Sequence, residues 1–120
     1  MDKAQALQGF WNQFLPAYDE GTVPDGAVLP YITYAASFGA WEDYIAMTAS
    51  VWYHSTSWAG IEAKVQEIND YIGLSGRLVP YDGGAMWIQR ATPFAQRMTD
   101  PDDMIRRYVL QITAEYLTQD

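Results

Sequence analysis

The chain has no cysteine and a single histidine, His54, among its 120 residues. Without cysteine there is no disulfide and no thiolate metal site, and one histidine leaves zinc without its usual ligands. A reducing compartment is compatible with this composition. We therefore expect neither a disulfide framework nor a metal site.

Long hydrophobic runs are also missing. The apolar stretches are only a few residues long, and no charged-then-apolar leader opens the sequence. A membrane-spanning helix needs about 20 apolar residues, so we expect no membrane span, no secretory signal and no membrane partner. Hydrophobic residues still make up 49% of the chain, which supports a real core. We expect a single domain over residues 1–120.

Basic residues are scarce. Seven Lys and Arg face fifteen Asp and Glu, for a net charge of −8, and Lys3 is the only base in residues 1–60. Sequence-independent binding to DNA or RNA depends on Lys and Arg neutralising phosphates. The composition therefore predicts no tight nucleic-acid binding. It suits an ordinary acidic domain, or a surface that repels a polyanion.

Apolar spacing predicts two helices. In residues 4–15 the large apolar side chains fall on one face, with Asp2 as a cap and Pro16 as the end. Residues 57–71 repeat apolar side chains at three- and four-residue spacing and stop at Gly73, which can adopt the left-handed geometry of a helix C-terminus.

Residues 31–38 and 44–51 predict a first pair of strands, joined at a break that begins at Gly39. The first of them is β-branched and aromatic, and the second alternates large and small residues with period two. After the second strand, hydroxyl side chains at positions 55–57 are expected to cap the backbone N–H groups that open the next helix.

A second hairpin is predicted from residues 78–81 and 85–91 around a glycine turn at 82–84. Residues 92–103 are expected to form a polar connection. Residues 108–117 alternate like a strand with one buried face, with a helix as the alternative.

The expected order is helix, two strands, helix, three strands. This pattern predicts an α+β fold of two layers, with a mostly antiparallel or mixed sheet of about five strands and both helices on one face. Residues 16–30, which hold three prolines, two glycines and three acids, are expected to form a long connection without regular structure.

No catalytic or cofactor-binding constellation is apparent. His54 and Ser55 are neighbours on a strand and point to opposite faces, whereas nucleophilic triads are assembled from distant segments. The aspartates of residues 100–103 lack the glycine and the downstream glutamate of a calcium loop, so we interpret them as a solvated turn. We assign no catalytic residue, no cofactor and no metal ligand.

Aromatic residues are abundant instead: five Trp, nine Tyr and four Phe. A small two-layer domain has limited room for so many, and aromatics with Met and Arg are enriched in protein interfaces. In the predicted connection, Phe94, Arg97 and Met98 are candidate interface residues, with packing under the sheet as the alternative. Trp52 is assigned to the core.

Several segments occur together in a recognisable order. They are Leu29-Pro30-Tyr31-Ile32-Thr33-Tyr34, Trp52-Tyr53, Ser55-Thr56-Ser57-Trp58, Ile72-Gly73, Gly83-Gly84, Trp87-Ile88 and Pro93-Phe94-Ala95-Gln96-Arg97-Met98. With these segments in this order, from about Trp11 to Leu117, the chain resembles the small minor capsid or tail-completion proteins of long-tailed bacteriophages of Gram-positive hosts, of the tail-terminator type.

The resemblance implies a non-enzymatic virion component of the head–tail neck, assembled in the host cytoplasm. Such proteins form a ring, typically a hexamer, that stops tail-tube growth and docks to the head connector. The implied partners are other copies of the chain, the tail-tube protein and the head connector or stopper protein. A head-side stopper or connector is the near alternative, and a bacterial α+β small-molecule-binding or adaptor domain is the alternative of a different class.

Overall fold

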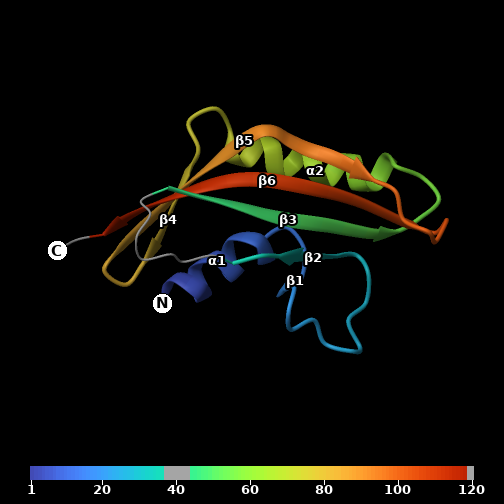
Figure 1. Ribbon diagram of the computed structural model, residues 1–120, viewed down its shortest axis with the longest axis horizontal. Helices are drawn as coiled ribbons and strands as arrows, with labels where there is room; N and C mark the ends of the chain where they lie inside the picture. The colour runs from blue at the N-terminus through green and yellow to red at the C-terminus, as the bar shows by residue number, and fades with distance from the viewer. Residues whose placement is uncertain (37–43, 119–120) are drawn as a thin grey trace.

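The computed structural model describes residues 1–36 and 44–118 and contains a mixed six-stranded sheet with two helices (Figure 1). The elements in chain order are α1 (Lys3–Asn12), β1 (Ala17–Asp19), β2 (Tyr31–Tyr34), β3 (Tyr44–His54), α2 (Ala59–Ile72), β4 (Arg77–Tyr81), β5 (Gly84–Met98) and β6 (Ile105–Thr118).

The sheet has the strand order β1-β2-β3-β6-β5-β4. The short strand β1 runs parallel to β2, and the remaining neighbours are antiparallel. The predicted α+β class, the mostly antiparallel mixed sheet and both predicted hairpins are confirmed. Residues 108–117 lie in a strand, so the helical alternative for this segment is wrong.

Local signals determine the helix ends. Asp2 caps α1 in a capping box, in which its carboxylate accepts the Gln5 backbone N–H at 2.8 Å and the Gln5 side chain accepts the Asp2 N–H at 3.0 Å. Gly73 ends α2 with a positive φ of +66°, as predicted, but its ψ of −174° is extended rather than left-handed helical. At the start of α2, the N-cap residue is Trp58 and makes no side-chain cap bond, while the Ser57 hydroxyl accepts the Ala59 N–H at 3.1 Å.

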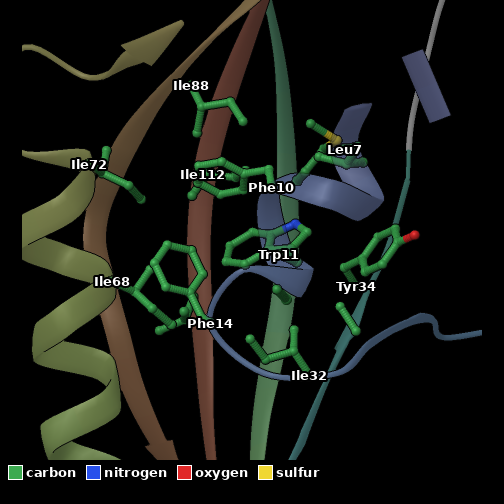
Figure 2. Packing of buried hydrophobic residues seen from close by; sticks show 14 of the residues in the cluster. Leu7, Phe10, Trp11, Phe14, Ile32, Tyr34, Ile68, Ile72, Ile88 and Ile112 are labelled. Atoms are coloured by element: carbon green, nitrogen blue, oxygen red, sulfur yellow. The ribbon is translucent and has the colours of Figure 1, made fainter. Parts of the chain in front are cut away.

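The core lies between the two helices and one face of the sheet. Figure 2 shows Phe10 and Trp11 of α1 in the middle of the buried cluster, with Ile68 and Ile72 of α2 on one side and Ile32 of β2 on the other. Alternate residues of the long strands complete the cluster, because successive side chains in a strand point to opposite faces. They include Ile45, Met47, Ala49 and Val51 of β3, Leu110, Ile112 and Ala114 of β6, and Met86 and Ile88 of β5.

Helix α1 contacts both β1 and β4, which are the two edge strands of the sheet. The sheet must therefore curl around this helix. Aromatic contacts link α1 to α2 inside the curl: the rings of Phe10 and Tyr71 are stacked with centroids 6.2 Å apart. Both helices thus cover the same face of the sheet, as predicted.

Two segments predicted to lack regular structure form strands. Within residues 16–30, β1 pairs with β2 over three residues, which is too short to leave a periodic signal in the sequence. The predicted polar connection at 92–103 is wrong over its first half, because β5 continues to Met98. Its pairing with β6 shifts register between Arg90 and Ala95, and this irregularity, which contains Pro93, interrupts the alternation that marks a strand.

The predicted strand over residues 31–38 ends at Tyr34. Residues 37 and 38 and the expected break at Gly39 lie outside the described residues. The sheet has six strands rather than about five because β1 adds one at the edge.

Candidate interaction surfaces

Strand β5 places the three predicted interface residues in different surroundings. Phe94 is half-buried and packs against the core cluster. Arg97 and Met98 are adjacent in the strand and therefore point to opposite faces of the sheet. Arg97 lies on the helix-covered side, where it reaches α2, and Met98 lies on the other side with 39% of its surface exposed.

Arg97 belongs to a cluster that ties the β5–β6 hairpin to the start of α2. Its guanidinium forms an ion pair with Glu62 of α2, and its Nε donates to the Tyr108 hydroxyl at 3.2 Å. The Tyr108 hydroxyl in turn donates to Glu62 at 3.2 Å. The guanidinium groups of Arg97 and Arg106 both lie over the Trp58 ring, at 4.5 and 5.2 Å from its centroid.

The ion pair changes the proton affinity of its carboxylate. The hydrogen bond from Arg97 holds the pKa of Glu62 below its ordinary value, despite an opposing contribution from partial desolvation. A carboxylate with a lowered pKa in the folded state stabilises the protein above its unfolded-state pKa, and this contribution disappears as the pH falls through the folded pKa. Both side chains are about half exposed, so the contribution is small.

We therefore expect the melting temperature of the wild type to exceed that of Glu62→Gln by a small, constant margin above about pH 5, and this margin to shrink below about pH 4. Thermal melts of both proteins from neutral to acidic pH measure this difference in melting temperature. Arg97→Gln is the matched control, because removing the partner should abolish the same pH dependence. A margin that stays constant down to pH values near about 3 would contradict this role of the pair.

A second candidate surface lies on the sheet face opposite the helices. The strand registers align Tyr31 of β2 with Trp52 of β3, Trp52 with Arg107 of β6, and Arg107 with Met98 of β5. Tyr31 and Trp52 are next in sequence to the buried Ile32 and Val51 and therefore point away from the helices, and the strand pairing puts Arg107 and Met98 on the same face. We call these four residues the outer row. Tyr, Trp, Arg and Met are residue types enriched in protein interfaces.

The outer row is held in place by side-chain contacts. The Arg107 guanidinium lies 4.6 Å from the centroid of the Trp52 ring, and its Nε and Nη2 donate to the Ser50 hydroxyl at 3.2 and 3.1 Å. The Trp52 Nε1 donates to the Thr33 hydroxyl at 2.9 Å. These contacts bury Ser50 and Thr33 on a face that no described helix covers.

The histidine and the aspartate cluster considered in the sequence analysis form no functional site in the described residues. His54 is exposed at the end of β3. Asp100 and Asp102 accept backbone N–H groups from Asp102 and Met104 at 2.9 and 2.8 Å, which confirms a turn. In residues 1–36 and 44–118, no group of three or more His, Asp or Glu side chains could hold a metal ion, and no helix is long and apolar enough to cross a membrane.

A cleft of about 480 Å³ opens beside the irregular part of β5. Among the described residues that line it, Arg90 is the one ionisable side chain, and it donates to the Asn69 side chain at 2.5 Å. A cleft with a single cation holds no acid–base pair. This cleft therefore adds no argument for an enzymatic centre.

Sequence reasoning found Met98 of the outer row and missed the other three residues. Trp52 was assigned to the core, although it is half-buried on the outer face. The alternation of β3 does contain this information, because Ile45, Met47, Ala49 and Val51 form the buried set and Trp52 falls on the opposite parity. Arg107 and Tyr31 are neighbours of Trp52 only because their strands pair, and this pairing could not be predicted from the sequence.

The fold defines an α+β domain with a curled sheet around one helix. No protein-family model matches the chain, and no curated protein matches it in sequence. A chain in a solved structure described as the virion of a native gene transfer agent particle is similar in fold. The TM-score is 0.68 at 19% sequence identity, over 95% of this chain and 96% of the neighbour. At this identity the likeness establishes the fold.

Proposed function

We propose that the chain is a phage-type virion structural protein, and more narrowly a tail terminator. The observation that carries this proposal is the fold likeness to a chain of a gene transfer agent virion, which extends over nearly the whole of both chains. The motif order described above supports the same class independently of the structure. In this role the protein acts by assembly rather than by catalysis.

The narrower role is a ring, typically a hexamer, at the head-proximal end of the tail. Its partners are other copies of the chain, the tail-tube protein and the head connector or stopper protein. Phe94, Arg97 and Met98 remain candidate contact residues. Met98 has the strongest support, because it is exposed and belongs to the outer row. Homo-oligomers favour closed symmetry, which suits a ring around a tube.

Electron microscopy of tail tubes mixed with the purified full-length protein tests this role. We expect rings at one end of each tube and no further tube growth at that end. The matched control is the same tube preparation without the protein. Tube ends that stay bare and continue to grow would contradict the terminator role. Binding to an isolated head connector instead would favour the stopper alternative.

A further inference from the structure

The outer row contains an arginine, Arg107, that is oriented by its neighbours but receives no carboxylate from the described residues. Two of its guanidinium nitrogens donate to the neutral Ser50 hydroxyl, and the ring of Trp52 lies beneath it. Arg97, by contrast, has the Glu62 carboxylate. In the described residues, Arg107 forms no ion pair. A guanidinium that is stacked on a ring and already oriented loses little freedom when it binds a carboxylate.

The chain itself has an excess of carboxylates. Its net charge is −8, and within residues 1–36 and 44–118 the carboxylates that form ion pairs are those of Glu62, Glu67 and Asp82. A second copy of the chain therefore offers many unpaired acids to Arg107. This charge complementarity favours a copy of the same protein as the occupant of the outer row.

One of these acids is better placed than the others. The β5–β6 connection lies at one end of the long axis of the molecule (Figure 1) and contains Asp100, Asp102 and Asp103. Asp100 and Asp102 use their carboxylates to accept backbone N–H groups of the turn. Asp103 is exposed, and in the described part of the chain its carboxylate makes no hydrogen bond or ion pair.

We propose that the outer row binds a second copy of the chain, with Arg107 on Trp52 receiving the Asp103 carboxylate from the neighbour's β5–β6 connection. Each copy then presents two different patches, the row and the connection. Asp103 and Arg107 lie close together at the start of β6, so such contacts can pair two copies reciprocally or close into a ring. The inference deepens the proposed function and rests on it only for the biological setting of the contact.

A charge swap tests the contact. Arg107→Glu and Asp103→Arg each place like charges opposite each other, so each variant alone should self-associate at least roughly tenfold more weakly than the wild type. An equal mixture of the two should recover association. The substituted row of Arg107→Glu can bind the substituted connection of Asp103→Arg, and the unchanged row of Asp103→Arg can bind the unchanged connection of Arg107→Glu. Sedimentation velocity over a concentration series measures the wild type, the two variants and their mixture.

Arg77→Glu and Asp25→Arg are the matched controls. They make the same changes in net charge at positions outside the proposed contact, on strand β4 and in the loop between β1 and β2. Both should self-associate like the wild type. Circular dichroism verifies that all four variants are folded. Wild-type protein that stays monomeric up to about 1 mM, where a specific contact would be populated, overturns the proposal, as does a mixture that shows no recovery.

Tube capping separates this inference from the proposed function. If Arg107→Glu caps tail tubes as well as the wild type does, the contact is wrong and the terminator role stands. If the wild type fails to cap tubes but the swapped mixture recovers association, the contact stands and the terminator role fails.

Discussion

Replacing Trp11 with alanine is expected to lower the free energy of unfolding by about 3–5 kcal/mol, because it empties a large site in the core. Trp11 is 1% exposed, and its ring meets that of Phe10 edge-on at 4.9 Å. A domain of this size has a total stability of roughly 5–15 kcal/mol. The melting temperature should therefore fall by roughly 10–20 °C. Urea unfolding, followed by tryptophan fluorescence or circular dichroism, measures the loss in the free energy of unfolding.

Trp52→Ala is the matched control for this prediction. It removes the same side chain from the outer row, where the ring is half-buried and makes one hydrogen bond. We expect a smaller loss of about 1–2 kcal/mol, measured in dilute solution so that self-association does not contribute. Equal losses for the two variants would mean that the outer face is covered as completely as the core.

The second large effect is expected at Gly76, in the turn between α2 and β4. Its φ is +77°, and a Cβ atom there would lie 2.6 Å from the Ile88 carbonyl oxygen and 2.7 Å from the Trp87 Nε1. The carbonyl belongs to the backbone of β5 and cannot rotate away. The same Trp87 Nε1 donates to the Ser75 carbonyl oxygen at 2.8 Å, a bond that the displaced turn would lose.

Gly76→Ala should therefore cost about 3 kcal/mol or more, combining left-handed backbone strain of about 1–2 kcal/mol with a lost hydrogen bond of about 1 kcal/mol and the displacement of β5. Denaturant unfolding measures the total. Two other glycines separate the contributions. Gly83→Ala, with φ of +92° and open space around its Cβ position, should show the backbone strain alone.

Gly9→Ala should have the opposite sign. Gly9 lies inside α1, and outside its own helix backbone the described residues place no atom within 4 Å of its Cβ position. Alanine there should stabilise the protein by about 0.5–1 kcal/mol through helix propensity. If Gly76→Ala costs no more than Gly83→Ala, the close approach of the turn to β5 is wrong.

The sequence by itself determined the parts of this protein that depend on neighbouring residues. The sequence showed the Asp2 cap, the apolar stripes of α1 and α2 and the end of α2 at Gly73, because helix caps and helix faces involve residues a few positions apart. The hairpin around Gly83 was readable for the same reason. These elements, in this order, were enough to predict an α+β fold with both helices on one face.

Tertiary structure decided everything that depends on pairing between distant strands. β1 exists because β2 lies beside it, and β5 continues through its irregular segment because β6 offers a partner on the far side. The same pairing separates Arg97 from Met98 and assembles the outer row from four strands. Strand register is set by long-range packing, and the amino-acid sequence alone does not show which strands will be neighbours.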